Sequence, residues 1–321
     1  MKNIYLNIYK SNLNNLKKAK IYVENNNVIG LPTETVYGLA ANAYSDKSIK
    51  KIYNLKKRPS INPLIIHFNN LKQLQKDAIC NKSFLKLYKK LCPGPITFIL
   101  NKKPKSKISK KATAGKKTVA VRFPQHPVAR RLLKMLKVPL AAPSANISSR
   151  LSPTSAKDVI DEFNNKVKFI LDGGKCKIGL ESTIIDLTKK PVILRQGFIT
   201  PKKIYKVLGK KILFRKISKI IKSPGQLKLH YSPGIPVYLN KTRAKKNGAF
   251  ISFGKKFKNA KKYFNLSEKN NLTEAAKNLY NTMRYIKKLK FKSISVCTIP
   301  NLGLGKAIND RLEKASNKWM N

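Results

Sequence analysis

Short apolar runs, many of them followed by a polar turn and then by a helical pattern, recur along this sequence from residue 28 to residue 299. Each run is shorter than the ~20 residues that cross a bilayer as a helix. The pattern therefore predicts buried strands and amphipathic helices of a globular protein. Hydrophobic residues make up 42% of the 321 residues, and because domains cluster near ~100–200 residues, we expect two compact units.

The first unit is predicted to be an α/β domain. Helical patterns alternate with apolar runs at its beginning and apolar runs follow one another closely further on, which indicates a twisted mixed sheet with flanking helices. The expected helices cover residues 11–25, 45–58, 71–79, 83–91, 127–136, 155–163 and 200–208, and the expected strands cover 28–31, 63–68, 96–100, 118–123, 138–142, 167–171, 182–187 and 192–195.

The chain after this unit is expected to form a linker and a smaller domain. Thr200 and Pro201 are a cap and first-turn pair for a helix that ends before Gly209, so the first domain is predicted to cover residues 1–209. Residues 210–235 contain the turn sequences KSPG and HYSPG, so we interpret them as a linker that can act as a lid. Residues 236–321 follow a pattern of strand, strand, helix, strand and helix, which is typical of a small three-layer α/β domain. The expected strands are 236–240, 248–253 and 293–299, and the expected helices are 272–289 and 306–316.

The formal charge of +55 comes from 69 Lys and Arg residues against 14 Asp and Glu residues. One interpretation is a nucleic-acid binder that holds phosphates. The other is a compositional drift toward A/T-rich codons. We favour this drift because Lys, Asn and Ile are frequent along the whole chain, whereas an RNA-binding surface would concentrate its basic residues in one stripe. The charge alone does not assign a function.

The four cysteines, Cys80, Cys92, Cys176 and Cys297, lie far apart and form no C-x-x-C pair. With three histidines to join them, we expect neither a zinc site nor a disulfide framework, and we assign no metal ligand. The N-terminus lacks the basic segment and long apolar stretch of a signal peptide. We expect a cytoplasmic protein that does not associate with a membrane.

Several polar segments follow predicted strands, where ligands bind in α/β folds. Residues 32–39 bring hydroxyls and a glycine, residues 141–146 bring backbone N–H groups, a hydroxyl and an amide, and Arg195 ends an apolar run. A buried arginine needs an anionic partner, either a protein carboxylate or a ligand phosphate. The cations at residues 56–58 end a predicted helix, where cations are also common for structural reasons alone.

Taken together, these segments resemble the YrdC-like family of threonylcarbamoyl-AMP synthases, in the long form with an additional C-terminal domain. The motifs that carry the resemblance lie in order between Val28 and Gly197: LPTETVYGLAANA, the K-x-R-P-x-x-N-P-L segment from Lys56, CPGPITFIL, TVAVRFPQHP, APSAN, SPT, ESTIIDL and LRQG. HYSPG at His230 matches the linker of the long form, whereas the last domain matches only loosely. The resemblance implies an L-threonylcarbamoyladenylate synthase, a nucleotidyltransferase that forms threonylcarbamoyl-AMP and pyrophosphate from L-threonine, bicarbonate and ATP for the threonylcarbamoyladenosine modification of tRNA.

The resemblance also implies the site residues. The motifs K-x-R and S-x-N correspond to catalytic positions at Lys56, Arg58, Ser144 and Asn146. The implied ATP-binding positions are Arg58, Asn62, Ser144, Ser152, Arg195 and Tyr231, and the implied threonine-binding positions are Thr35, His67, Thr118, Arg122, Ala142 and Ser182. Without the resemblance, His67 would be interpreted as a buried structural histidine and Tyr231 as a tyrosine packed on the domain surface.

The implied chemistry needs no nucleophile from the protein. Threonine and bicarbonate would form a carbamate, whose carboxylate attacks the α-phosphorus of ATP and expels pyrophosphate, so that positioning and charge stabilisation supply the catalysis. The sequence has no D-x-D or similar carboxylate cluster, so we expect Mg²⁺ to be held by ATP, neutral groups and water. The implied partners are a downstream enzyme that transfers the threonylcarbamoyl group to tRNA and, through the basic charge, a weak contact with tRNA.

Two other functions remain as alternatives. One is a hydrolase or carbamoyl-transfer enzyme that uses the same cavity, although the zinc-finger cysteine pairs of the larger carbamoyl-transfer proteins are missing here. The other is a non-catalytic RNA-binding module, which would bind RNA with a strong salt dependence. The second alternative leaves the threonine-side residues without a purpose.

Overall fold

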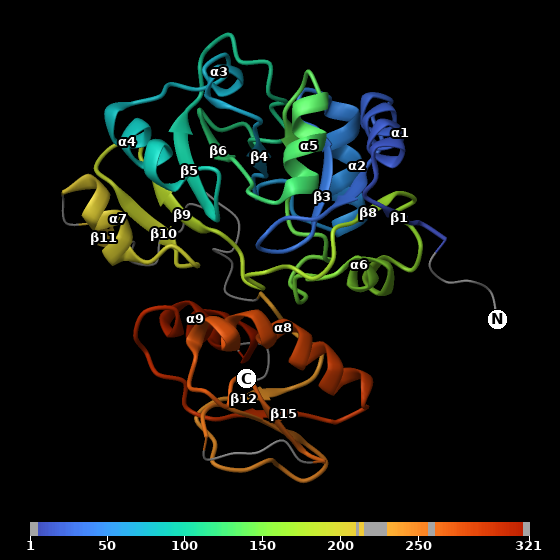
Figure 1. The fold of residues 1–321 in the computed structure, drawn as a ribbon, viewed down its shortest axis with the longest axis vertical. Helices are drawn as coiled ribbons and strands as arrows, with labels where there is room; N and C mark the ends of the chain where they lie inside the picture. Colours follow the sequence, from blue (N-terminus) through green and yellow to red (C-terminus); the bar gives the residue numbers. More distant parts are fainter. Residues whose placement is uncertain (1–5, 210–211, 215–229, 256–260, 317–321) are drawn as a thin grey trace.

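The computed structural model describes residues 6–209, 212–214, 230–255 and 261–316 of the chain, and in this part it contains two β-sheets. Figure 1 shows the larger sheet with its helices above and the smaller sheet below, with helices α8 (Leu272–Lys288) and α9 (Gly305–Ser316) between the two. The turn sequence at residues 222–225 of the expected linker lies outside the described residues. Among the described residues, no helix combines the length and apolar character needed to cross a membrane.

The larger sheet has 11 strands in the order β1-β8-β2-β3-β7-β4-β6-β5-β9-β10-β11. Its strands are β1 (Ile8–Lys10), β2 (Ile29–Leu31), β3 (Gly38–Asn42), β4 (Ile65–His67), β5 (Ile96–Asn101), β6 (Thr118–Arg122), β7 (Leu140–Ala141), β8 (Ile170–Asp172), β9 (Thr183–Asp186), β10 (Val192–Arg195) and β11 (Leu213–Phe214). Parallel pairs such as β4 with β6 occur beside antiparallel pairs such as β5 with β6. The predicted mixed sheet is therefore confirmed.

Seven helices accompany this sheet in the described residues: α1 (Leu13–Glu24), α2 (Asp46–Lys56), α3 (Leu71–Leu74), α4 (Lys82–Leu91), α5 (Pro127–Met135), α6 (Ala156–Phe163) and α7 (Pro201–Leu208). Successive strand side chains point to opposite faces. Thus Leu39 and Ala41 of β3 join the core cluster that contains the apolar residues of α2, α4, α6 and α7, whereas Ala40 joins the cluster of α1 and α5.

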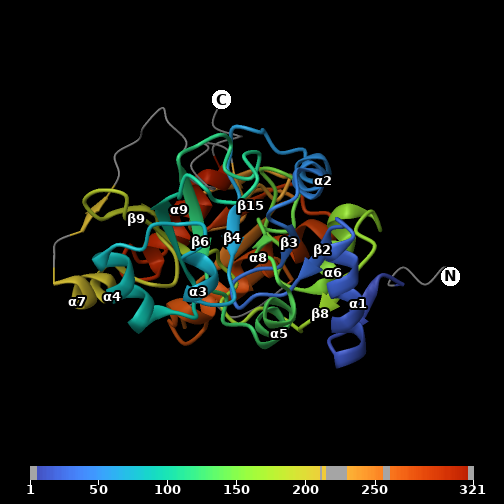
Figure 2. The same ribbon diagram turned by 90° about the horizontal axis from the view of Figure 1, so that it is seen from above.

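The smaller sheet is entirely parallel, in the order β12-β15-β13-β14. Its strands are β12 (Val237–Tyr238), β13 (Ala249–Ser252), β14 (Tyr263–Asn265) and β15 (Ile294–Val296). The apolar faces of α8 and α9 pack on it, and the same core cluster continues into Val36, Leu151 and Leu180 of the first domain. Figure 2, viewed from above, places α8 and α9 beneath the central strands of the larger sheet. We call this second unit the C-terminal module.

Most expected elements occur, with differences that have physical reasons. The expected loop at residues 32–39 ends in strand β3, which begins at Gly38. Its sequence GLAAN lacks the β-branched and aromatic residues that signal a strand, so its extended conformation comes from antiparallel pairing with β2 and β7. Strands β1, β11 and β14 were also not predicted. Strand β11 lies within the expected linker and pairs in parallel with β10. Helix α3 covers only Leu71–Leu74 of the expected range 71–79. The proposed domain boundaries at 209 and 235 stay a prediction.

Candidate active site

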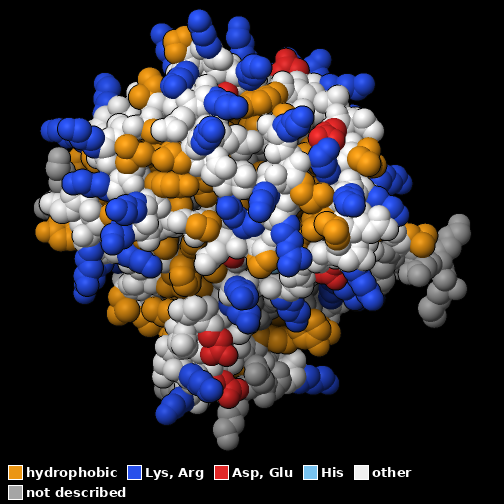
Figure 3. Space-filling view, turned by 45° about the horizontal axis from the view of Figure 1, so that its top comes forward, with side chains coloured by type: hydrophobic (Ala, Val, Ile, Leu, Met, Phe, Trp, Pro, Cys, Tyr) orange, Lys and Arg blue, Asp and Glu red, His pale blue; other side chains and the backbone are white. Residues whose placement is uncertain are grey.

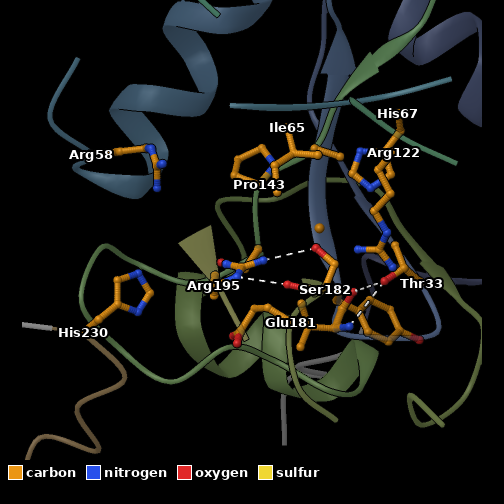
Figure 4. Close-up of a pocket in the computed structure, with 15 residues that line it drawn as sticks. Thr33, Arg58, Ile65, His67, Arg122, Pro143, Glu181, Ser182, Arg195 and His230 are labelled. Carbon is orange, nitrogen blue, oxygen red and sulfur yellow. Dashed lines mark hydrogen bonds between the residues drawn. The ribbon is translucent and has the colours of Figure 1, made fainter. Parts of the chain in front are cut away.

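A pocket lies on the face of the larger sheet that looks toward the C-terminal module. The alternating residues Ile65 and His67 of β4 point into it, and so does Arg122 at the end of the adjacent parallel strand β6. Figure 4 shows Arg58 and His230 on one side of the pocket, Arg122 and His67 on the other, and Arg195 with Ser182 between them. The lining residues are Thr33, Val36, Tyr37, Gly38, Arg58, Ile65, His67, Arg122, Ala142, Pro143, Ser144, Glu181, Ser182, Arg195 and His230.

The loop with the S-x-N motif, residues 143–146, forms one wall of the pocket and is held by backbone contacts. The N–H of Leu39 donates to the carbonyl of Pro143 at 2.9 Å, and the N–H of Ala145 donates to the carbonyl of Tyr37 at 2.7 Å. A Cβ at Gly38 would come within 3.2 Å of the Pro143 carbonyl oxygen. The close approach of these two loops explains why a glycine stands at this position.

Lys56 clamps this wall instead of pointing into the pocket. Its buried ammonium donates to the carbonyls of Ser144 at 2.6 Å and Asn146 at 2.5 Å. Burial, together with the charge of Arg58, lowers the pKa of Lys56. The K-x-R and S-x-N motifs are therefore joined physically, with Lys56 fixing the position of the loop that presents Ser144.

Arg58 lines the pocket and is fixed by the loop that follows it. Its Nε donates to the carbonyl of Asn62 at 3.0 Å, and its Nη2 donates to Oδ1 of Asn62 at 2.5 Å and to the carbonyl of Pro63 at 3.0 Å. Asn62 is thus the residue that orients Arg58, while its own buried Nδ2 has no hydrogen-bond partner among the described residues.

Arg195 enters the pocket from the end of β10 and is held by Ser182. Its Nε donates to the Ser182 carbonyl at 3.0 Å, and its Nη2 donates to the Ser182 hydroxyl at 3.1 Å. That hydroxyl also shares a 2.7 Å hydrogen bond with the hydroxyl of Thr97. Both of these hydrogen bonds are with neutral groups, so neither of them balances the charge of the guanidinium.

The opposite end of the pocket contains an arginine and a histidine. Arg122 Nη2 forms a 2.8 Å ion pair with Oε1 of Glu34, and both side chains are buried. Burial, and then the charge of Arg122, lower the pKa of His67 to about 3, so the imidazole is neutral near pH 7. Neither ring nitrogen of His67 nor the Nε of Arg122 has a hydrogen-bond partner in the described part of the chain. Buried polar groups are normally paired, so these atoms indicate a ligand position.

The linker contributes His230, which lines the pocket, and Tyr231, which lies buried behind it. Their rings are 4.0 Å apart, and Tyr231 stacks on Tyr280 of α8 at 5.8 Å. Burial lowers the pKa of His230 to about 3 and raises the pKa of Tyr231. The Nδ1 of His230 and the hydroxyl of Tyr231 are both buried and, within the described ranges, unpaired.

The structure brings seven of the predicted residues to the pocket surface: Arg58, His67, Arg122, Ala142, Ser144, Ser182 and Arg195. The other seven, Thr35, Lys56, Asn62, Thr118, Asn146, Ser152 and Tyr231, do not line it. Five of these contact lining residues: Lys56 through Ser144, Asn62 through Arg58, Thr35 through the hydroxyl of Thr33 at 2.9 Å, Ser152 through Glu181 at 2.6 Å, and Tyr231 through the ring of His230.

Asn146 and Thr118 are placed differently from the simplest expectation. The Nδ2 of Asn146 donates to the carbonyls of Ile147 and Arg150, and its buried Oδ1 has no partner among the described residues. Thr118 is at the opposite end of β6 from Arg122. There Thr118 pairs with Asn101 of β5, and it does not reach the pocket lining.

Sequence reasoning missed the roles of Glu34, Glu181 and His230 in the pocket. The two carboxylates lie within the motifs LPTETVYG and ESTIIDL, and they are scarce in a chain with 14 acidic residues, which is the signal that could have found them. Burial would raise the pKa of Glu181, but the charges of Arg311 and then Arg195 hold it at about 2. No group of three His, Cys, Asp or Glu side chains that could hold a metal occurs in the part of the chain that the structure describes.

Comparison with known proteins gives matches over nearly the whole chain. A family model described as telomere recombination matches residues 22–197, and one described as the C-terminal domain of threonylcarbamoyl-AMP synthase matches residues 199–317. The threonylcarbamoyl-AMP synthase of Pyrococcus abyssi is 37% identical over 94% of each chain, and that of Bacillus subtilis is 35% identical over 94% of this chain and 92% of its own. The crystal structure of P. abyssi Sua5 complexed with L-threonine superimposes with a TM-score of 0.88 and 34% identity, over 97% of each chain.

Proposed function

The chain belongs to the threonylcarbamoyl-AMP synthase family, and from this premise we propose that the pocket described above is its catalytic site. The enzyme is a nucleotidyltransferase that forms threonylcarbamoyl-AMP and pyrophosphate from L-threonine, bicarbonate and ATP. One observation supports this pocket as the site. Three guanidinium groups, from Arg58, Arg195 and Arg122, line the same pocket, and several buried polar atoms in and behind its wall have no hydrogen-bond partner among the described residues. Such a site fits a ligand with a triphosphate at one end and a carboxylate at the other.

The side of the pocket with Arg58 and Arg195 is proposed to bind ATP, and we call it the nucleotide half. Both guanidinium groups are fixed by neutral partners before the substrate arrives, so they can stabilise phosphate charge without reorganising. Ser144 adds a hydroxyl from the loop that Lys56 clamps, and Asn62, Asn146 and Tyr231 add unpaired polar atoms behind it. Ser152 acts through Glu181, whose carboxylate accepts its hydroxyl.

The side with Arg122 and His67 is proposed to bind threonine, and we call it the threonine half. Arg122 uses Nη2 for Glu34, which leaves its other donors for the amino-acid carboxylate. Neutral His67 offers one donor and one acceptor, and Ser182, Thr35 and the backbone of Ala142 complete this half. Thr118 also belongs to the implied threonine-binding set, and because it does not line the pocket, we propose that it supports this half indirectly.

In the reaction, the threonine amine and bicarbonate condense to a carbamate with loss of water. A carbamate oxygen then bonds to the α-phosphorus of ATP while the bond from that phosphorus to the pyrophosphate oxygen breaks. The charge that moves onto the leaving pyrophosphate is met by Arg58 and Arg195. This is catalysis by positioning and electrostatics, and loss of one preorganised donor in comparable sites costs ~2.7–4 kcal/mol.

The residues of the pocket do not fit a Mg²⁺ ion held by the protein. Glu181, the carboxylate that lines the pocket, accepts from Arg311, and Glu34, which does not line the pocket, is paired with Arg122. Mg²⁺ prefers carboxylates, waters and substrate phosphates. We therefore propose that Mg²⁺ enters, if at all, as part of the ATP substrate, and no step is assigned to it here.

The basic surface supports at most a weak contact with tRNA. Figure 3 shows Lys and Arg side chains spread over the visible face among apolar and neutral ones, without a continuous stripe. A stripe would be the footprint of a dedicated RNA-binding surface. We propose that a downstream enzyme transfers the threonylcarbamoyl group to tRNA, and that the distributed charge adds a salt-sensitive attraction to that tRNA.

The test of the function is pyrophosphate release by the full chain with ATP, threonine and bicarbonate. Release should require all three substrates, and omission of threonine or bicarbonate should abolish it. ATP hydrolysis that continues without threonine would contradict the synthase and favour the hydrolase alternative. RNA binding without any turnover of ATP would instead favour the binding module.

A further inference from the structure

Glu181 is a buried carboxylate at the boundary between the catalytic pocket and the C-terminal module. It lines the pocket and directly precedes Ser182, the residue that holds Arg195. Its Oε1 accepts from the hydroxyl of Ser152 at 2.6 Å and from the hydroxyl of Tyr280 at 3.1 Å. Its Oε2 accepts from the same Tyr280 hydroxyl at 3.1 Å and from Nε of Arg311 at 3.2 Å.

Most of these contacts come from the C-terminal module. Tyr280 belongs to α8 and Arg311 to α9, and their side chains are 0% and 1% exposed. Arg311 is itself held by Asp310, which accepts from its Nη1 at 2.8 Å. A charge so fully buried must be paired, and Glu181 is the acidic partner that the first domain provides for it.

Arg195 makes no ion pair with Glu181 among the described residues, although the two charges lie close enough to interact electrostatically. Its hydrogen bonds go to Ser182 instead. Arg195 and Arg311 are therefore two cations beside the Glu181 carboxylate, and Arg311 is the one that forms an ion pair with it.

We propose that Arg311 is a positioning residue for the nucleotide half: it neutralises Glu181 and holds this carboxylate away from Arg195, so that the Arg195 guanidinium remains available to the anionic substrate. This inference rests on the proposed function of the pocket. It gives the C-terminal module a chemical role in ATP binding, although neither Arg311 nor Tyr280 lines the pocket.

Removal of Arg311 should affect Arg195 through Glu181, an effect that loss of an ordinary contact between the two domains would not have. Glu181 would remain buried with one fewer donor, and Arg195 would be the arginine left beside it among the described residues. A buried carboxylate without its partner is strongly unfavourable, so Glu181 would turn to Arg195 and compete with the substrate phosphates. The loss should then disappear when the carboxylate is removed as well.

The experiment compares full-length wild type with Arg311→Met and with the double variant Glu181→Gln/Arg311→Met. The KM for ATP in pyrophosphate release should rise about tenfold or more in Arg311→Met, as for a lost charged contact, while the KM for threonine changes less than about twofold. The double variant should recover most of the ATP affinity, because it contains neither buried charge.

Arg284→Met is the matched control. Arg284 also reaches from α8 into the first domain, where it donates to the Leu151 carbonyl and lies near Glu162 at 3.6 Å, but it does not contact Glu181. Because its partners do not line the pocket, Arg284→Met should change the KM for ATP less than about twofold. An equal rise in the KM for ATP in Arg284→Met and Arg311→Met would overturn the proposal. A KM for ATP in the double variant as high as that in Arg311→Met would overturn it too.

A milder variant covers the case in which Arg311→Met does not fold. Tyr280→Phe keeps the buried ring and removes the hydroxyl that donates to Glu181, and it should raise the KM for ATP about threefold. Unchanged ATP affinity in Tyr280→Phe would contradict the proposal. Calorimetric binding of a non-hydrolysable ATP analogue measures the same effect without turnover, so failure of the synthase reaction in wild type is distinguished from failure of the positioning role.

Discussion

Both halves of the pocket contain arginines, but the acidic and neutral groups around these arginines come from different parts of the chain. In the threonine half, Arg122 is paired with Glu34, which comes from the same domain and lies in the loop between β2 and β3. In the nucleotide half, Arg195 has neutral partners, and the nearby carboxylate of Glu181 is bound by Arg311 of the C-terminal module. The acidic partner of the arginine in the proposed threonine half thus comes from the first domain, whereas the carboxylate beside the proposed nucleotide half is bound by an arginine of the C-terminal module.

This difference follows from what each ligand needs. A single carboxylate is matched by one arginine whose charge is already partly balanced by Glu34. A triphosphate has several negative charges, and a carboxylate bound to Arg195 would repel it. In our proposal, the C-terminal module binds this acidic group and so prevents it from competing with the phosphates of ATP for Arg195.

The largest effect is expected from removing a cation of the nucleotide half. Arg58→Met and Arg195→Met should each lower kcat/KM for ATP by about 10²–10³, since a preorganised charged donor to the transition state is lost. Threonine affinity, measured by calorimetry, should change little. Lys57→Gln, whose exposed side chain lies between Lys56 and Arg58 in the sequence, is the control and should retain activity. If threonine binding fell as far as ATP binding, the division into two halves would be wrong.

A somewhat smaller effect is expected at the other end of the pocket. Arg122→Met should raise the KM for threonine by about 10- to 100-fold through loss of a charged hydrogen bond. It should also lower the free energy of unfolding by about 3–5 kcal/mol, because Glu34 is left buried without its partner. Urea unfolding of Arg122→Met and of Glu34→Gln/Arg122→Met checks this, and the double variant should be the more stable of the two. Binding of an ATP analogue should stay near that of wild type in both.

Histidines of both halves of the pocket are expected to make the free energy of unfolding depend on pH. The pKa values of His67 and His230 are about 3 in the folded protein and 6.5 ordinarily, so below pH 6.5 the unfolded chain binds protons that the native state does not. Stability should fall as the pH drops from 6.5 toward 3, by up to about 1.4 kcal/mol per pH unit for each histidine. Glu181, with a pKa of about 2 against 4.5, adds a loss only below pH 4.5.

Urea unfolding at a series of pH values measures this slope. His67→Gln and His230→Gln should each reduce the slope of the unfolding free energy with pH, between pH 6.5 and pH 4, by the contribution of one titrating group. A variant with an unchanged slope would show that its imidazole is protonated in the native state.

The smallest effect is expected from surface charges outside the pocket. Lys241→Gln and Lys269→Gln replace exposed lysines of the C-terminal module and should change the rate of pyrophosphate release less than about twofold, because exposed charges contribute little. They should slightly reduce the salt dependence of tRNA binding in a filter assay. A large loss of synthase activity in either variant would mean that the module acts through its surface charge rather than through Arg311.

Local signals in the sequence predicted much of the fold. Capping residues, prolines and apolar periodicity located most helices within a few residues, as for the helix that Pro201 begins and Gly209 ends. They did not reveal β3, because a strand of small residues has no local preference for that conformation and is defined by its neighbours. The motifs predicted seven of the lining residues, but they presented Lys56 and Arg58 as equivalent cations.

The sequence by itself determined the family, the mixed α/β architecture and the types of residue available for binding an anionic nucleotide and an amino acid. Only the tertiary structure decided which side chains face the pocket, which of them support others, and which acidic group neutralises which cation. Lys56 points to backbone carbonyls, Glu34 meets Arg122 across 88 positions, and Glu181 meets Arg311 across 130. The reason is physical: helix and strand signals arise between neighbours in the chain, whereas burial and charge pairing depend on groups that only folding brings together.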